Sequence, residues 1–417
     1  MNNKTKNTIT VFEHQAIFTN KGIHRLTIKH LEALQNFYKE VDFPYYTLVH
    51  KGVRFCEYVG VLQVGNLTIE VLPKADNDGE EYWRTMLIDM LRTVGLFKVN
   101  APSNSNLNLK TNSVLDLYFE LFVQEAEELL HKGLIKKYRK TQNNITVLKG
   151  SLLFAKQLQK NLVHQERFYT RHTIYDREHP LNCVLYKTLL LLNRISANQS
   201  LQSRIGSLLL NFPELPPIKT DDAFFDKIQY SRKTELYKAA IDIAKLILLN
   251  YHPDVNKGNN DVLALMFDMN SLWEKFVFTS LRKNKPSNYT LKSQSVKQFW
   301  KKNGGRGKKM IPDIVIENDN NEVVVIDTKW KNIGTSNPSD ADLRQMYAYS
   351  KFHNNAKTAL LYPGLSNDFI EGVFYNEENN SFISNNNCGI MTVTVEGNIK
   401  KWQLSIANNV FNSSLFD

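Results

Sequence analysis

Residues 311–330 read IPDIVIENDNNEVVVIDTKW, and this stretch decides the fold of the C-terminal part of the chain. Two runs of β-type residues, 313–317 and 323–330, flank a polar loop at 318–322, which predicts a β-hairpin. If Glu317 pairs with Val323, the antiparallel register places Asp313 opposite Asp327. Directly opposed residues have Cβ atoms ~5 Å apart. The hairpin therefore predicts a close pair of carboxylates.

Lys329 joins this pair, because residues two apart on a strand share one face. Two carboxylates at such a distance can share a hard divalent cation such as Mg2+ or Mn2+. A cation of this kind activates water and polarises a phosphate. Lys329 would orient that water or stabilise the developing negative charge.

The alternative is an ordinary surface hairpin with exposed charges, because the bare pattern Pro-Asp followed by Asp-x-Lys is weak on its own. The run Val323–Ile326 is apolar on both faces, as in a strand buried inside a domain. A buried strand that ends in Asp-Thr-Lys favours a functional role for the charges.

Size and composition limit the classes of protein to which the chain can belong. The chain has 417 residues, 42% hydrophobic and 23% charged, which is typical of a globular protein with two or three domains. No run approaches the ~18 apolar residues of a membrane span, and the polar N-terminus shows no secretory signal. The three cysteines, Cys56, Cys183 and Cys388, are far apart, so we expect no disulfide framework, no zinc site and a cytoplasmic location.

The net charge of +10 favours a polyanionic partner. Residues 281–310 carry many Lys and Arg but no Asp or Glu, and Tyr289, Phe299 and Trp300 lie among them. Basic residues interleaved with aromatics suit a nucleic-acid backbone, whereas the alternative is a solvated loop that only aids solubility. The candidate DNA-binding residues are Lys292, Lys297, Lys301, Lys302, Arg306, Lys308 and Lys309.

The fold class is predicted to be α/β with several domains. We expect a β-rich N-terminal domain at 1–110, a mostly helical domain at 111–255 and a mixed sheet flanked by helices at 256–417. The main helices are expected at 80–96, 113–130, 180–192, 234–249, 270–283 and 340–352. Strands are expected at 67–71, 146–154, 293–299 and 358–362, besides the hairpin, and the alternating strand 67–71 is expected to leave one face free. Residues 175–179 are interpreted as a loop or helix start.

Three further side chains are candidates for the same site. Glu274 lies at the rim of an apolar helix face as an extra metal ligand, although Ser271-x-x-Glu274 also fits a capping box. Gln345 and Tyr349 are four apart on a helix and share a face, where they would hold a phosphate or position Lys329. On spacing alone, an ordinary amphipathic helix explains that last pair better.

The chain lacks the phosphate-binding pattern GxxxxGK[ST], so it is not expected to bind ATP or GTP by a P-loop. The patterns GxSxG, HExxH and HxE with PCxxC are absent too.

Together these pieces resemble a known family. Pro312-Asp313, Asp327-Thr328-Lys329 and Gln345-x-x-x-Tyr349, with Glu274 upstream, look like the PD-(D/E)XK nuclease core. The wider chain resembles McrC, the nuclease subunit of McrBC modification-dependent restriction systems. The matching pieces run in family order from about residue 50 to residue 362 and include residues 58–60, 69–74, 133–138, 148–150, 179–182, 267–274, 327–330 and 345–349.

The resemblance implies a division of labour. In that family the partner McrB is a hexameric AAA+ GTPase that recognises modified, methylcytosine-containing DNA, while McrC docks through its N-terminal part, stimulates GTP hydrolysis and cuts double-stranded DNA. Carried over, Asp313, Asp327 and Glu274 are metal ligands and Lys329 is the catalytic lysine, with Gln345 and Tyr349 as site members. The absent P-loop agrees with a motor on another chain.

Two other interpretations remain open. One is a stand-alone PD-(D/E)XK repair nuclease, against which the long N-terminal half weighs. The other is a non-enzymatic activator of an AAA+ NTPase with a decayed nuclease core, against which the intact Asp313, Asp327 and Lys329 weigh.

Overall fold

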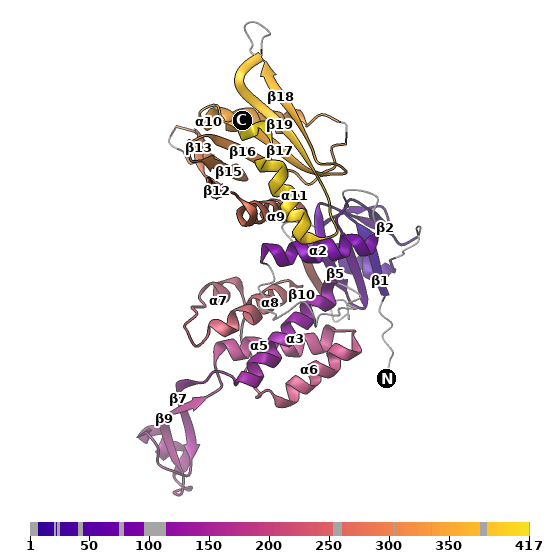
Figure 1. Cartoon of the computed structure of the whole chain (residues 1–417). Coiled ribbons are helices and arrows are strands. Elements are labelled where there is room, and N and C mark those ends of the chain that lie inside the picture. Colours follow the sequence, from indigo (N-terminus) through magenta and orange to yellow (C-terminus); the bar gives the residue numbers. More distant parts are fainter. Residues whose placement is uncertain are drawn as a thin grey trace. The chain divides into compact units, whose positions relative to one another are not determined.

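The computed structural model describes residues 7–20, 22, 26–40, 45–74, 79–95, 114–252, 261–303, 305–334, 336–375 and 382–416 (Figure 1). The chain divides into two compact units. The middle unit contains the described residues 114–252, and the bipartite unit joins the described residues of 7–95 to those of 261–416. Two stretches far apart in sequence therefore build one unit. The expected division into three domains at residues 110 and 255 stays a prediction.

The hairpin that carries the candidate site residues belongs to a six-stranded mixed sheet in the bipartite unit. The strand order of this sheet is β12–β15–β16–β17–β19–β18. Its strands are β12 (Tyr289–Ser293), β15 (Ile314–Asn318), β16 (Val323–Thr328), β17 (Lys357–Gly364), β18 (Asp368–Tyr375) and β19 (Phe382–Thr394). Strand β16 pairs antiparallel with β15 and parallel with β17. Parallel neighbours need a crossover, and helix α10 (Asp340–Phe352) supplies it, as its sequence predicts. The expected mixed α/β sheet is confirmed.

The predicted hairpin register is confirmed. Glu317 pairs with Val323 and Ile314 pairs with Ile326, so the position before β15, Asp313, faces Asp327 in the same register. Residues 324–328 are buried, because α10 and α9 (Met269–Asn284) both contact β16. The turn is closed by the Asn318 side chain, which accepts from the backbone N–H groups of Asn320 (3.0 Å) and Glu322 (2.9 Å).

The N-terminal stretch forms a second sheet in which β1 (Asn7–Phe12), β6 (Leu67–Leu72), β5 (Tyr58–Val64) and β11 (Val262–Asp268) are neighbours in that order. Because β11 belongs to the C-terminal stretch, this pairing joins the two parts of the unit. A smaller sheet has the order β2 (Ala16–Phe18), β4 (Gly52–Phe55) and β3 (Tyr46–Val49). Helices α1 (Ile28–Glu40) and α2 (Glu80–Val94) complete this part, and α2 ends at Gly95 in the left-handed conformation.

Three expectations about strands are wrong. Strand β6 is buried at every residue, with β1 and β5 along its edges and α2 in contact with it, so neither of its faces is free. The strand expected at 293–299 is two strands, β12 and β13 (Lys297–Lys301), in different sheets. In the stretch 146–154 only Ser151–Leu152 is a strand, β8, and the chain then enters helix α4 (Phe154–Asn161).

The middle unit is mostly helical. Besides α4, its α-helices are α3 (Val114–Lys132), α5 (Pro180–Ile195), α6 (Gln199–Asn211), α7 (Asp222–Asp226) and α8 (Lys238–Leu249). Proline at the first turn and the His179 cap start α5, so residues 175–179 end a strand and lead into a helix. Residue 113, where the helix expected at 113–130 begins, lies outside the described residues.

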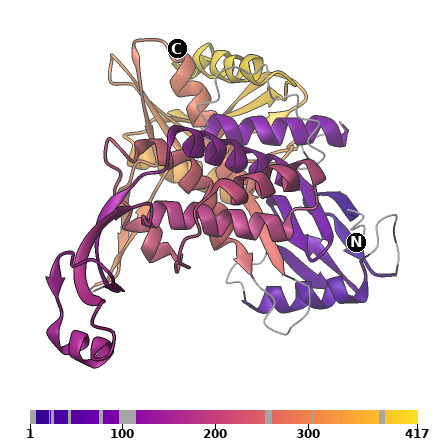
Figure 2. The same cartoon turned by 90° about the horizontal axis from the view of Figure 1, so that it is seen from below.

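A hairpin of β7 (Lys137–Ile145) and β9 (Phe168–Asp176) extends away from the helices of the middle unit (Figures 1 and 2). The sequence did not predict this arm, whose long strands are polar. Helix α4 lies at its far end and exposes Phe154, Leu158 and Leu162 by 65–73%. Exposed apolar side chains gathered in one place are typical of an interaction surface.

The cysteines and the helices bear on two expectations from composition. Cys56, Cys183 and Cys388 are free thiols. Within the described residues, every helix is too short or too polar to cross a membrane.

Gly60 offers a test of how β5 and β11 join the two stretches. Its φ is +133°, and an added Cβ would lie 2.1 Å from the carbonyl oxygen of Leu265 on β11. Gly60→Ala is expected to lower the free energy of unfolding by on the order of 3 kcal/mol, because the clash and the strained φ add. Urea unfolding measures this. Gly79→Ala, where nothing lies within 4 Å, is the control and is expected to cost less than about 1 kcal/mol. Equal costs would contradict the close approach of β11.

Candidate functional site

Two aspartates meet where β15 begins and β16 ends. Asp313 Oδ2 accepts hydrogen bonds from the backbone N–H of Thr328 (2.7 Å) and from its hydroxyl (2.9 Å). These bonds close the hairpin beyond the last strand pair and hold Asp313 beside the end of β16. The side chain of Asp327 is only 1% exposed, because it continues the buried face of that strand.

Lys329 faces these carboxylates, as the two-residue spacing predicts. Its Nζ lies 2.7 Å from Asp327 Oδ2 and 3.9 Å from Asp342 Oδ1. Burial opposes the charge on the ammonium, but Asp327, Asp342 and Asp313 together raise the pKa of Lys329. The backbone N–H of Lys329 donates to the carbonyl of Leu361 at 3.0 Å, so the residue is held as an extension of the β16–β17 ladder.

Gln345 and Tyr349 on α10 also belong to this cluster. Gln345 Nε2 donates to Asp327 Oδ1 (3.1 Å) and to the Tyr349 hydroxyl (2.7 Å), while its Oε1 accepts from Lys329 Nζ (3.4 Å). The Tyr349 hydroxyl donates to the carbonyl of Ile311 at 3.0 Å, and burial raises the pKa of Tyr349 to about 12. The helix face is amphipathic, yet Gln345 bonds to Asp327 and Tyr349 bonds to Gln345, so the plain amphipathic interpretation does not account for these contacts.

The capping-box interpretation of Glu274 is wrong. Asp268 caps α9 instead, since its carboxylate accepts from the backbone N–H of Ser271 at 2.7 Å. Glu274 Oε1 accepts from Gln294 Nε2 at 3.2 Å. Burial and then the nearby charge of Asp313 raise the pKa of Glu274, with Asp327 contributing in the same direction. The carboxyl of Glu274 therefore lies within electrostatic range of both aspartates.

The ionisation of Asp327 is the most perturbed feature of the site. Burial, then the charge of Asp313, raises the pKa of Asp327 from its usual 3.8 to about 6, although Lys329 acts in the opposite direction. Two carboxylates close together in a low-dielectric place disfavour simultaneous ionisation. The site thus holds more negative charge than one lysine compensates.

The donor set suits a hard cation. In the described part of the chain no three His, Cys, Asp or Glu side chains converge as a complete metal cage. Mg2+ is usually held by one or two carboxylates and keeps several waters, so a full cage is not required. Asp327 Oδ2 is buried and has an ion pair with Lys329 but no hydrogen bond of good geometry. A carboxylate oxygen in this state, with Asp313 beside it, fits a divalent cation.

Two residues, Asp342 and Asn270, contact the site or the adjacent Trp330 and were not singled out as site members from the sequence. Asp342 pairs with Lys331 (2.7 Å) as well as with Lys329, and the Lys331 hydrogen bond holds the pKa of Asp342 below its usual value despite burial. Asn270 accepts from the backbone N–H of Trp330 at 3.2 Å. Asp342 could have been found, because it lies three residues before Gln345 and so shares its helix face.

The candidate DNA-binding residues lie mainly on one hairpin, β13 paired with β14 (Gly307–Met310). Phe299 packs against Phe352 of α10 with ring centroids 5.3 Å apart, and Lys297 Nζ donates to the Phe352 carbonyl at 2.7 Å. The exposed cations of the hairpin are Lys301, Lys302, Arg306, Lys308 and Lys309. Lys292 differs, since it lies on β12 and pairs with Glu317 at 3.0 Å.

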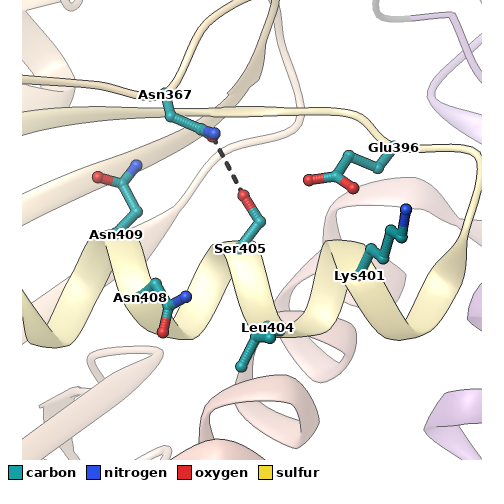
Figure 3. A pocket seen from close by; sticks show the side chains of 7 residues that line it. All are labelled: Asn367, Glu396, Lys401, Leu404, Ser405, Asn408 and Asn409. Atoms are coloured by element: carbon teal, nitrogen blue, oxygen red, sulfur yellow. Dashed lines mark hydrogen bonds between the residues drawn. The ribbon is translucent and has the colours of Figure 1, made fainter.

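A hollow elsewhere on the same unit does not contain this chemistry. Asn367, Glu396 and several side chains of helix α11 (Ile399–Phe411) line it, and Ser405 donates to Asn367 at 3.4 Å (Figure 3). It contains none of the candidate site residues.

Comparisons with known proteins match the chain to the family that the motifs resemble. Residues 53–363 match the family model described as "McrBC 5-methylcytosine restriction system component". The "Type IV methyl-directed restriction enzyme EcoKMcrBC" of Escherichia coli K12 is 21% identical over 252 residues, which are 57% of this chain and 72% of that protein.

Two solved structures share the fold. The "Refined half-complex from tetradecameric assembly of Thermococcus gammatolerans McrB AAA+ hexamers with bound McrC" contains a chain that matches with a TM-score of 0.71 and 20% identity, over 97% of this chain and 100% of that one. The "Cryo-EM structure of the Thermococcus gammatolerans McrBC complex" gives a TM-score of 0.51 and 20% identity, over 67% of this chain and 89% of that one.

The raised pKa of Asp327 predicts a specific pH dependence of stability. Because the folded state binds the Asp327 proton more tightly than the unfolded state, this stabilising contribution is present below about pH 4 and is lost as the pH rises through about 6. Asp327→Asn keeps a neutral group at every pH. In buffer without divalent cations, the melting temperature of the variant minus that of the wild type should increase from pH 4 to about pH 6 and then level off. A difference that is constant over this range would contradict the assignment.

Proposed function

Since this chain belongs to the family of McrBC 5-methylcytosine restriction system components, we propose that it is the DNA endonuclease subunit of such a system. It would cut foreign DNA that contains methylcytosine, with Mg2+ or Mn2+ as cofactor, and act with an AAA+ GTPase supplied by another chain. The observation that carries the proposal is the convergence of Asp313, Asp327 and Lys329 at the end of one buried strand.

The site residues would divide the work of phosphodiester hydrolysis. Asp313 and Asp327 would hold the cation, with Glu274 as a further ligand. A bound divalent cation supplies Lewis acidity and a water of lowered pKa. Lys329, held as an ammonium by its aspartate neighbours, would orient the attacking water or stabilise charge on the phosphate. Gln345 would keep Asp327 and Lys329 in place, since it bonds to both.

The substrate class follows from charge. The β13–β14 hairpin leads through Met310 directly into Asp313, so its cations lie close in sequence to the carboxylates. Cations of this kind contact phosphates of any sequence, which positions DNA without reading bases. Recognition of the modified base would then belong to the partner.

The partner would be an AAA+ hexamer, as in the Thermococcus gammatolerans assembly of McrB AAA+ hexamers with bound McrC. Docking through residues 1–110 stays a prediction, although the buried face of β6 removes one of its supports. The arm of the middle unit is a second candidate surface, because α4 exposes Phe154, Leu158 and Leu162 beside Lys156 and Lys160.

The two alternatives predict different behaviour. A stand-alone repair nuclease would cut DNA without any partner. A non-enzymatic activator would raise the GTP hydrolysis of the partner but leave DNA intact. Cleavage that requires both the cation and the partner supports the proposal over both alternatives.

Substitutions at the site test the catalytic assignment. Asp313→Asn, Asp327→Asn and Lys329→Ala are each expected to reduce DNA cleavage at least about 100-fold, because each removes a group that stabilises the transition state. Plasmid cleavage with Mg2+ and partner measures this, and melting temperature shows whether the fold persists. Asp340→Asn is the matched control, since its side chain is 88% exposed on the same unit. Full activity in either site aspartate variant would refute the assignment.

Substitutions on the basic hairpin test the role of its cations. The double variant Lys301→Ala, Lys302→Ala is expected to bind all DNA sequences more weakly and to lower the slope of log affinity against log salt by about 1 per lost contact. Fluorescence anisotropy over a salt series measures both. The control changes Lys29 and Lys39, two exposed lysines of α1. An unchanged salt slope would mean that the hairpin does not contact phosphates.

Substitutions also separate the two docking surfaces. Phe154→Ser with Leu158→Ser is expected to reduce the stimulation of partner GTP hydrolysis, whereas Leu210→Ser, which changes an 88% exposed leucine of α6 in the same unit, should not. Truncation is less suitable, because β11 completes the N-terminal sheet. The α4 variant could stimulate GTP hydrolysis by the partner normally, while Asn66→Ala in the β5–β6 turn reduces that stimulation. Docking would then belong to residues 1–110.

A further inference from the structure

Trp330 stands directly after Lys329 and points to the opposite side of the strand end. Its ring lies between Trp83 of α2 and Trp273 of α9, with centroid distances of 6.2 Å and 5.4 Å. Trp402 of α11 stacks on Trp273 at 5.4 Å. The buried indoles therefore form one cluster behind the candidate site.

One member of this cluster has a polar partner that the others lack. Among the described residues, the ring N–H groups of Trp83, Trp273 and Trp402 are buried without a hydrogen-bond acceptor. The Trp330 ring N–H donates to Glu13 Oε1 at 2.8 Å, across 317 positions of sequence. Packing alone would not require that bond, because the neighbouring indoles pack without one.

Glu13 is itself an unusual residue for its place. It follows β1, is only 8% exposed, and its Oε1 also accepts from the backbone N–H of Lys74 at 2.8 Å. Its Oε2 has no partner among the described residues. Burial raises the pKa of Glu13. Keeping an incompletely paired carboxyl here costs free energy, so a hydrophobic side chain would be the stabilising choice.

The contacts of Trp330 determine where the backbone of residues 329–330 lies. Asn270 accepts from the Trp330 backbone N–H, and the Leu361 carbonyl accepts from the Lys329 backbone N–H. Glu13 fixes the third point, the ring itself. With the backbone held on one side, the Lys329 ammonium is directed to Asp327 on the other.

We propose that Glu13 is a positioning residue that fixes Lys329 in the site through the indole N–H of Trp330. The proposal rests on the endonuclease function proposed above. It assigns to the N-terminal sheet a direct part in the geometry of the site, because removing the Glu13 acceptor frees the residue next to the lysine.

The test compares variants that keep or remove the hydrogen bond. Trp330→Phe keeps a ring in the cluster and removes the donor, and Glu13→Ala removes the acceptor. Trp402→Phe shrinks an indole of the same cluster that makes no such bond, and Glu13→Gln keeps an acceptor oxygen. Melting temperatures show the cost of repacking in each variant.

Two readouts are measured for every variant. The first is DNA cleavage with Mg2+ and partner, in which Trp330→Phe and Glu13→Ala are expected to lower kcat about 10- to 100-fold without raising KM, since misplacement by about 1 Å has effects of this size. The second is the rate at which formaldehyde and cyanoborohydride methylate Lys329, followed by mass spectrometry. That rate should rise several-fold in the same two variants. Trp402→Phe and Glu13→Gln should resemble the wild type in both readouts.

The outcomes separate this proposal from the proposed function. If Trp330→Phe behaves as Trp402→Phe in kcat and in Lys329 methylation, the positioning role is overturned. If the double variant Glu13→Ala, Trp330→Phe loses the product of the two single effects, the residues act independently and the proposal also fails. If the wild type cuts no DNA, the endonuclease function fails, and the methylation rates alone decide whether Glu13 positions Lys329.

Discussion

The burial of strand β16 is the constraint on which the bipartite unit depends. β15 and β17 pair with it on either side, and helices α9 and α10 contact it, so residues 324–328 have little contact with water. A charged side chain in such a strand is costly unless it is paired. The charges Asp327 and Lys329 therefore stand at its end, where Asp313, Gln345 and Asp342 supply partners.

The resulting cluster is electrostatically unbalanced, and this imbalance is what makes it a candidate site. A purely structural ion pair would match one carboxylate with one ammonium. Each partner would then shift the pKa of the other so that both groups stay charged. Here burial and Asp313 raise the pKa of Asp327 even though Lys329 lies 2.7 Å away. Perturbation of this kind, from desolvation together with specific charged neighbours, is characteristic of functional sites. It also explains why an added cation would stabilise the arrangement.

The candidate site is not built by the C-terminal stretch alone, because residues of the N-terminal stretch contact Trp330 beside it. β11 pairs with β5, Trp330 packs against Trp83 of α2, and Glu13 bonds to the Trp330 ring. Residues from the first hundred positions thus contact the strand end that carries Lys329. These contacts form a short physical path from the N-terminal sheet to the residue next to the lysine.

Local pattern was sufficient for the core of the site. The hairpin register, helix α10 and the shared face of Asp327 and Lys329 follow from turn length, periodicity and strand alternation, all of which act over a few residues.

Prediction from local pattern failed where the contacting residues come from far away in the chain. The alternating residues of β6 suggested a free face, but β1 and β5 on its edges and covering side chains bury it. Likewise the capping box at Glu274 was plausible locally, but Asp268 is the cap, which leaves Glu274 near the aspartates. The long strands β7 and β9 of the arm are polar and lack the apolar alternation from which strands are predicted. The sequence by itself therefore determined the family and the three central groups, Asp313, Asp327 and Lys329. Only the tertiary structure decided that Asn270 and Glu13 contact Trp330 beside them, because hydrogen bonds across 60 and 317 positions leave no periodic trace in the sequence.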